Sequence, residues 1–291
     1  MVLLADMGNT NVTVAGWGDG GRVFELRLPT DHSWDGAAYT TALREGLAGA
    51  GQADALFEGA ALCSVVPPLN EAVCAALQAV CGSAPVQLSR RGNTGGVDIF
   101  TDDPDEVGND LLAGAIAATA LAPMPAIVAD LGTATTFTAQ DKGGSILGVA
   151  IAPGVAMGLE ALAGRASQLF SVAIQGPKAA IGTNTVASLQ SGVVLGAAAL
   201  LDGMADRMEE ELNGEATLVV TGGLAKDVTP LCRHPLTYDP ELLLKGLALL
   251  YQLNAPQQHH HPAGGRKPHG QNFRRHRPFR RERHETEAKA G

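Results

Sequence analysis

The segment after the first apolar run carries residue types suited to binding phosphate. Residues 6–11 read Asp-Met-Gly-Asn-Thr-Asn and follow a short apolar strand at residues 2–5. Glycine lets the chain turn tightly, and successive backbone amides then form a concavity for phosphate oxygens. The Asp6 carboxylate would repel a phosphate unless a cation lay between them, and magnesium, which keeps several of its waters, is the usual cation. The turn therefore predicts a phosphate site with magnesium near Asp6, bound directly or through water.

The same design occurs a second time. Residues 129–134 read Ala-Asp-Leu-Gly-Thr-Ala and lie 124 residues after residues 5–10. A third apolar strand, residues 216–220, runs into Thr221-Gly222-Gly223. One such turn is weak evidence, because Asp, Gly and Asn are ordinary hairpin residues. Two copies favour a nucleotide held between two domains, with one turn from each on the phosphates and the Gly-Gly bend beside the adenosine.

The elements that must position these turns alternate between strand and helix, which indicates an α/β fold. Further strands are expected at residues 12–15, 59–66 and 126–140. Apolar spacing predicts helices at residues 37–49, 69–80, 105–121, 186–212 and 240–251. The third of these helices must end before Pro123, because proline lacks the amide that would continue it.

Seven short motifs of the sequence are similar to those of a known family. In chain order they are Asp6-x-Gly8-Asn9-Thr10, Ser64-Val65-Val66-Pro67, Pro104-x-Glu106-Val107-Gly108-x-Asp110, Asp130-x-Gly132-Thr133-Ala134-x-Thr136, Ile151-Ala152-Pro153-Gly154, Gly182-x-Asn184-Thr185 and Thr221-Gly222-Gly223. With them the chain resembles type III pantothenate kinase over residues 2–254. The resemblance implies two duplicated ribonuclease-H-like α/β domains with an interdomain nucleotide cleft, as in the actin, sugar-kinase and heat-shock ATPase superfamily. We place the first domain at 1–122, with the catalytic Asp, and the second at 123–254, with the adenosine motif.

The resemblance also implies a reaction, in which ATP phosphorylates the primary hydroxyl of pantothenate in the first step of coenzyme A synthesis. Asp110 matches the general base, a role that suits a carboxylate within reach of the attacking hydroxyl. Asp130 matches the ligand of a monovalent cation, K⁺ or NH₄⁺, and the family implies a homodimer whose partner subunit helps to close the pantothenate pocket. The expected nucleotide contacts are Asp6, Gly8, Asn9, Thr10, Asn11, Val12, Thr13, Gly132, Thr133, Gly222 and Gly223. The expected substrate contacts are Thr101, Gly108, Asn109, Asp110, Leu111 and Thr185.

Four positions depart from the family pattern. Leu111 replaces an arginine that would pair with the substrate carboxylate, and Thr101 replaces an aromatic residue of the pocket. Thr138 replaces an aspartate and Val149 a glycine. Because the nucleotide residues are kept while substrate residues differ, two alternatives to an active pantothenate kinase stay open. One is a non-catalytic regulatory relative, and the other is a kinase of another small hydroxylated substrate.

Charge is divided unevenly along the chain. Residues 255–291 hold nine Lys/Arg and three Asp/Glu, a net charge of +6. Because the whole chain has a net charge of −9, residues 1–254 have a net charge of −15. An acidic body argues against a nucleic-acid-binding core. The basic tail, which also holds six of the eight histidines, is expected to be disordered and to offer at most a weak site for nucleic acid or an acidic partner. His32 and His234 stand alone in the body and are expected to be structural.

Four cysteines without metal-site spacing suggest reduced thiols in a cytoplasmic protein. We expect no membrane span, because no uninterrupted apolar run reaches the roughly 18 residues that a bilayer needs.

Overall fold

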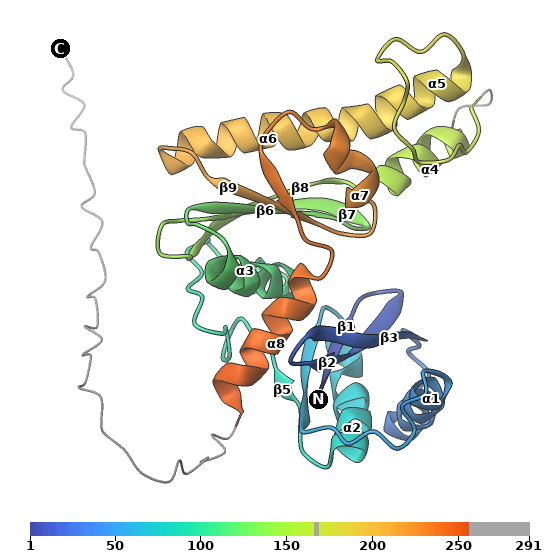
Figure 1. Ribbon diagram of the computed structural model, residues 1–291, viewed down its shortest axis with the longest axis vertical. Coiled ribbons are helices and arrows are strands. Elements are labelled where there is room, and N and C mark those ends of the chain that lie inside the picture. The colour runs from blue at the N-terminus through green and yellow to red at the C-terminus, as the bar shows by residue number, and fades with distance from the viewer. Residues whose placement is uncertain (166–168, 256–291) are drawn as a thin grey trace, which may run out of the picture. The chain divides into compact units, whose positions relative to one another are not determined.

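The computed structural model describes residues 1–165 and 169–255. These residues form two mixed five-stranded sheets with helices packed on their faces, a two-domain α/β fold (Figure 1). The first sheet has the order β3-β2-β1-β4-β5 and contains β1 (Val2–Met7), β2 (Asn11–Gly18), β3 (Gly21–Pro29), β4 (Gly59–Ser64) and β5 (Val86–Gln87). The second has the order β10-β9-β6-β7-β8 and contains β6 (Ala126–Leu131), β7 (Ala134–Gln140), β8 (Ile146–Pro153), β9 (Thr217–Thr221) and β10 (Leu236–Tyr238).

The first sheet is built around β1, which pairs antiparallel with β2 and parallel with β4. Successive side chains of a strand point to opposite faces. Leu3, Ala5 and Met7 pack in one core cluster with α1 (Gly36–Gly49) and α2 (Asn70–Cys81). Leu4 packs on the other face with α3 (Asn109–Leu121) and α8 (Leu242–Asn254). Both faces of this sheet are therefore covered by helices.

The second sheet repeats this arrangement around β6, which pairs antiparallel with β7 and parallel with β9. Ile127 and Leu131 pack against α6 (Gly196–Leu212), whereas Val128 lies on the opposite face with Ala117 and Ala118 of α3. Helix α3 contacts β4 of the first sheet as well as β6 and β7 of the second. It is therefore shared between the two sheets.

The last helix returns to the first sheet. Helix α8 contacts α3, β4 and β1, and its Leu247 and Leu250 are fully buried in the same cluster as Leu4. A side chain at Gly246 would collide with the backbone carbonyl of Ala113, so the two helices cross at the distance that only glycine allows. The core of the first sheet is thus completed by residues from the end of the described chain.

Most predicted elements are present, with shifted ends. The predicted helix over 105–121 is divided, because Val107 and Gly108 are extended and separate the short turn η2 (Pro104–Glu106) from α3. Strands β3 and β8 and helix α4 (Val155–Arg165) were not predicted as elements. The domain boundaries at 122 and 254 stay predictions, and the predicted disordered tail lies outside the described residues apart from Ala255.

One continuous helical stretch, Thr185–Leu212, is long and apolar enough to cross a membrane by length and composition alone. It consists of α5 (Thr185–Gln190), a π-helical turn η3 (Ser191–Leu195) and α6. Val194, Ala198, Leu201 and Ala205 pack one side of it against the second sheet. This helical stretch therefore meets the length and composition of a membrane span although one of its sides packs against the second sheet.

Candidate functional site

Two aspartates reach the same helix because of strand alternation. Asp6 follows Leu4 by two residues on β1, and Asp130 follows Val128 by two on β6, so both lie on the sheet faces that α3 covers. Asp110 is in the first turn of α3. The fold thus brings three carboxylates, one from each of three separate segments, into one cluster.

The pKa values of two of these carboxyl groups, Asp6 and Asp130, are raised. Burial, together with the charges of Asp110 and Asp130, raises the pKa of Asp6 to about 7, although a hydrogen bond with the Cys63 thiol opposes the increase. Burial and the charge of Asp110 raise the pKa of Asp130 to about 6. Oδ1 of Asp130 and Oγ1 of Thr138 are buried with no hydrogen-bond partner among the described residues. A bound cation would relieve the repulsion between these carboxylates, and hard cations prefer oxygen ligands such as carboxylates and hydroxyls. The residues present therefore fit magnesium and a monovalent cation.

The two predicted phosphate turns adopt related shapes. Gly8 N–H donates to the Asn11 carbonyl over 3.0 Å, and Gly132 N–H donates to the Ala134 carbonyl over 3.1 Å. Met7 pairs with Val12, leaving residues 8–11 in the first turn, whereas Leu131 pairs with Thr135, leaving residues 132–134 in the second. The duplicated turns therefore differ by one residue.

Exposure within the turns separates side chains that can meet a ligand from those that cannot. Asn9, Thr10 and Asn11 are exposed, as are Gly132 and Thr133. Thr13 is half-buried, and the side chain of Val12 is fully buried in the core. A nucleotide could therefore contact Val12 only through its backbone.

Thr30 supports the first turn and was not identified from the sequence. Its hydroxyl donates to the Gly8 carbonyl over 2.7 Å, and its N–H donates to the Thr10 carbonyl over 3.1 Å. The residue follows β3, a strand for which the sequence analysis made no prediction, so no signal pointed to it. Knowing that β3 pairs with β2 would have placed Thr30 beside the turn.

Two glycines allow close approaches to the second turn. Gly222 has φ +101°, and a Cβ there would lie 2.5 Å from Oδ1 of Asp130 and 2.6 Å from the Leu131 backbone. A Cβ at Gly154 would collide with the carbonyl of Thr133. Gly223, by contrast, has open space around its Cβ position. The Thr221-Gly222-Gly223 bend is therefore adjacent to Asp130, as a nucleotide site requires.

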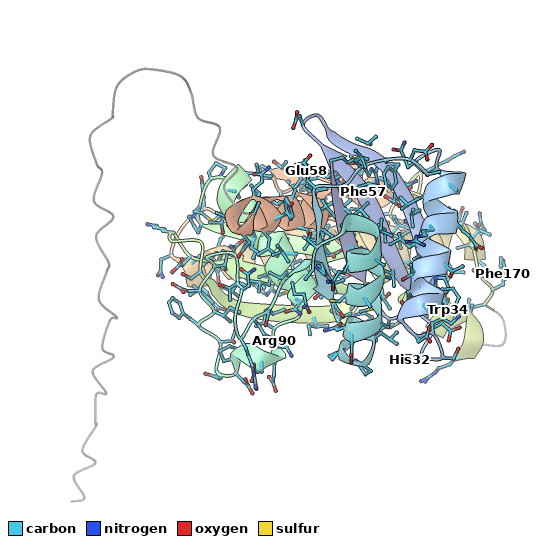
Figure 2. All side chains as sticks on the ribbon, turned by 90° about the horizontal axis from the view of Figure 1, so that it is seen from below. His32, Trp34, Phe57, Glu58, Arg90 and Phe170 are labelled. Atoms are coloured by element: carbon cyan, nitrogen blue, oxygen red, sulfur yellow. The ribbon has the colours of Figure 1, made fainter. Side chains whose placement is uncertain are left out.

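The predicted substrate segment is anchored to β4. The amide of Asn109 donates from Nδ2 to the Ser64 carbonyl over 3.0 Å. Arg90 Nη1 donates to the Val107 carbonyl over 3.0 Å, which places a guanidinium beside the segment that leads into Gly108 (Figure 2). Oγ1 of Thr101 and Oδ1 of Asn109 are buried without a hydrogen-bond partner among the described residues. The Asn109 oxygen is therefore available in the residue next to Asp110, whereas no contact of the described residues brings Thr101 to Asp110.

Leu111 faces the interior. It is half-buried and packs with the core cluster of α3 and α8. Together with Asp110, Asp130, Thr138 and Thr221 it also lines a cavity of about 10 Å³. That volume is near the minimum for one water molecule. Val149, the fourth departure, packs at the edge of the same core cluster.

Thr185 is not brought to the carboxylates. It is the exposed first residue of α5, whose N-cap is the side chain of Asn184. Figure 1 shows α5 well apart from α3, where Asp110 lies. A single chain therefore brings Asp6, Asp110 and Asp130 together, but not Thr185.

Comparisons with known proteins agree with this geometry. The sequence pattern of type III pantothenate kinase matches residues 2–207. The chain is 36% identical over 257 residues to a protein of that name from Acidothermus cellulolyticus, covering 88% of this chain and all of the relative. It is 39% identical over 263 residues to one from Streptomyces coelicolor, covering 87% of this chain and 98% of the relative.

Among solved structures, a putative 2-dehydro-3-deoxygalactonokinase from Sinorhizobium meliloti aligns with a TM-score of 0.50 at 13% identity, covering 88% of this chain and 97% of that one. That likeness concerns the fold alone. The extent of the sequence match, which includes both turns and all three carboxylates, identifies the chain as a member of the type III pantothenate kinase family.

Proposed function

We propose that this chain is a kinase that transfers the γ-phosphoryl group of ATP to the primary hydroxyl of pantothenate, the first step of coenzyme A biosynthesis. The observation that carries the proposal is the convergence of Asp6 from β1, Asp110 from α3 and Asp130 from β6 where the two phosphate turns begin. This convergence supports a site in which a general base, a nucleotide and a cation lie close together. Relatives that match nearly all of the described chain bear the name of this activity.

Asp110 is the general base in this proposal. Its Oδ1 accepts the Leu111 N–H over 2.9 Å, which fixes the carboxylate in the first turn of α3 and leaves Oδ2 for the substrate hydroxyl. As the hydroxyl oxygen bonds to the γ-phosphorus, the bond from that phosphorus to the β,γ-bridging oxygen breaks and ADP departs. The hydroxyl proton passes to Asp110. Positioning and charge neutralisation supply the rest of the rate enhancement.

The nucleotide lies between the turns in this proposal. Gly8, Asn9, Thr10, Asn11 and Thr13 contact the phosphates from the first sheet, with Val12 contributing its backbone. Gly132, Thr133, Gly222 and Gly223 contact the nucleotide from the second sheet. Asp6 would hold magnesium, and Asp130, together with the Thr138 hydroxyl that has no partner among the described residues, would hold a monovalent cation. When bound, these cations neutralise charge on the phosphates.

We propose that the protein acts as a homodimer in the cytoplasm. Large apolar side chains around α4 and α5 are exposed, including Ile151 (74%) and Ile181 (84%). Phe170, half of which is exposed, points outward at the edge of the same region (Figure 2). A second copy covering this face would bury these side chains and could bring its own Thr185 to the substrate pocket, which one chain leaves incomplete.

Leu111 favours a second candidate, a non-catalytic relative. Its side chain packs inward and offers no donor to the substrate carboxylate. The loss of one charged hydrogen-bonded partner costs about 1.5–3 kcal/mol of binding, so pantothenate must be held by another cation or held weakly. Arg90 is a candidate for that cation, since it lies beside the same segment.

ADP release measured with and without pantothenate separates the two functions. A kinase releases ADP in proportion to added pantothenate, and Asp110→Asn should reduce that rate by roughly 10²-fold or more while ATP binding is retained. Asp19→Asn, which lies in the exposed turn between β2 and β3, should behave as wild type. ATP binding without pantothenate-dependent ADP release would contradict the pantothenate kinase and leave the non-catalytic relative or a kinase of another small hydroxylated substrate.

A further inference from the structure

A second group of metal-ligating side chains lies on the far face of the second sheet. Asp206, Glu209 and His234 each offer one ligand atom, and these atoms lie within 4.8 Å of one another. Asp206 and Glu209 are on α6, and His234 is in the loop between the turn η4 (Thr229–Leu231) and β10. None of the three belongs to the site described above. We call this group the His234 cluster.

The loop that carries His234 is held to α6 by its backbone. The carboxylate of Asp202 accepts the N–H of Arg233 over 2.9 Å and the N–H of His234 over 3.0 Å. Asp202, Asp206 and Glu209 are spaced four and three residues apart, so they lie on one face of the helix. Asp202 therefore fixes the position at which the imidazole meets the other two carboxylates.

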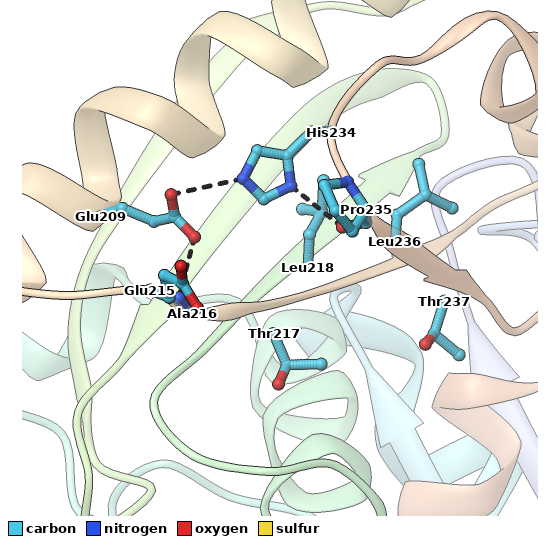
Figure 3. A pocket seen from close by; sticks show the side chains of 9 residues that line it. All are labelled: Glu209, Glu215, Ala216, Thr217, Leu218, His234, Pro235, Leu236 and Thr237. Carbon is cyan, nitrogen blue, oxygen red and sulfur yellow. Dashed lines mark hydrogen bonds and ion pairs between the residues drawn. The ribbon is translucent and has the colours of Figure 1, made fainter.

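The atoms of His234 and Glu209 that do not face each other are already bound to the backbone. Nδ1 of His234 is 2.9 Å from the Pro235 carbonyl, and Oε1 of Glu209 accepts the Ala216 N–H over 2.8 Å (Figure 3). Nε2 and Oε2 remain, and they face each other at 3.3 Å. Metal-bound histidines commonly donate their other ring N–H to a carbonyl in this way.

The separation suits a shared ion. Two ligands at about 2.0–2.1 Å from a tetrahedral zinc lie roughly 3.3 Å apart. Two cavities meet at His234: one of about 420 Å³ also contacts Glu209, and one of about 660 Å³ also contacts Asp206. Water can therefore complete the coordination. Two carboxylates would also balance the charge of a divalent ion.

We propose that the His234 cluster binds a first-row divalent transition metal, with Zn²⁺ as the reference ion. The imidazole selects such ions over Mg²⁺, which prefers oxygen ligands. The bound ion links α6 to the loop before β10 and stabilises that edge of the second sheet. The inference is independent of the kinase reaction, because it uses no residue of the nucleotide site.

The alternative is an ordinary ion pair. Burial opposes charging of His234, but the hydrogen bond with Pro235 and the nearby Glu209 and Asp206 carboxylates leave its pKa raised. Protonated His234 would then pair with Glu209 and need no metal. An ion pair and a metal site predict different responses to zinc, so the two can be separated.

The test titrates Zn²⁺ into the full chain and into His234→Gln, with His32→Gln as the matched control. Histidines of the tail are present in all three proteins, so the difference in the number of zinc ions bound per chain gives the number bound by the His234 cluster. Wild type and His32→Gln should bind one zinc more than His234→Gln. At zinc concentrations one hundred times Kd, their Tm should also rise about 5–10 °C more.

Equal zinc stoichiometry and equal Tm increases in wild type and His234→Gln would overturn the proposal in favour of the ion pair. If His234→Gln fails to fold, Asp206→Asn provides the same comparison, because Asp206 is exposed and its loss should not disturb the core. This variant should bind zinc at least tenfold more weakly than wild type. Unchanged affinity in Asp206→Asn would equally refute a three-ligand site.

Discussion

Removing the charge of Asp6 should stabilise the nucleotide-free protein at alkaline pH. Burial, with the charges of Asp110 and Asp130, raises the pKa of Asp6 from 3.8 to about 7. The unfolded chain therefore releases this proton near pH 4, whereas the folded protein keeps it until about pH 7. The contribution of Asp6 to the free energy of unfolding is fully present below pH 4. It decreases by about 1.4 kcal/mol per pH unit as the pH rises from 4 to 7. The total is about 4 kcal/mol, of which about 3 kcal/mol develops above pH 5.

Asp6→Asn keeps the shape of the side chain and has no proton to lose. Urea unfolding without nucleotide or divalent cation should show that the advantage of the variant over wild type grows by about 3 kcal/mol between pH 5 and pH 8. The exposed Asp19→Asn should follow wild type throughout. If the stabilities of Asp6→Asn and wild type change in parallel with pH, neither burial nor the charges of Asp110 and Asp130 raise the pKa of Asp6.

Three further predictions concern the turns and the substrate segment. Gly222→Ala should weaken ATP binding and lower the free energy of unfolding by about 1–3 kcal/mol, because the new Cβ meets Asp130 and the Leu131 backbone at a positive φ. Gly20→Ala, in the turn between β2 and β3 with open space around the new Cβ, is the control and should have little effect. Equal effects of the two variants in nucleotide titrations and urea unfolding would contradict this. Thr30→Ala should lower the free energy of unfolding by about 1 kcal/mol and raise the KM for ATP, because the Gly8 carbonyl loses its hydrogen bond. Thr41→Ala, which loses a hydroxyl contact within α1, is the control. An unchanged KM in Thr30→Ala would show that the first turn does not need this hydrogen bond to bind ATP. Leu111→Arg should lower the KM for pantothenate, because arginine adds hydrogen-bond donors for the substrate carboxylate, whereas the control Leu111→Met should not. An unchanged KM in Leu111→Arg would indicate that another cation, such as Arg90, already binds the carboxylate.

Local chemistry made the two turns predictable. Each needs only a short apolar strand, a carboxylate, a glycine and a following β-prone run, all of which are contiguous in sequence. The second turn is shorter by one residue, a difference that the motif comparison alone did not reveal. The Thr221-Gly222-Gly223 bend was also predictable, because a glycine pair after an apolar strand marks a close backbone approach.

Long-range contacts were not predictable in the same way. The position of Thr30 depends on the pairing of β3 with β2, and the inward orientation of Leu111 depends on the packing of α3 between two sheets. His234 was interpreted as an isolated histidine because its partners on α6, Asp206 and Glu209, are 28 and 25 residues earlier in the sequence. The start of α3 was placed too early, because nothing local indicated that Val107 and Gly108 are extended.

The return of α8 to the first sheet has a consequence for synthesis. The strands of that sheet end at Gln87, whereas α8 begins at Leu242, so the 154 residues 88–241 separate the sheet from the helix that completes its core. At about 5–20 residues per second, the ribosome needs about 8–30 s to make them. During that time the face that includes Leu4 and Ala61 lacks Leu247 and Leu250. The N-terminal half therefore cannot finish folding as a nascent chain, and a premature stop before α8 would leave an apolar surface for chaperones and proteases.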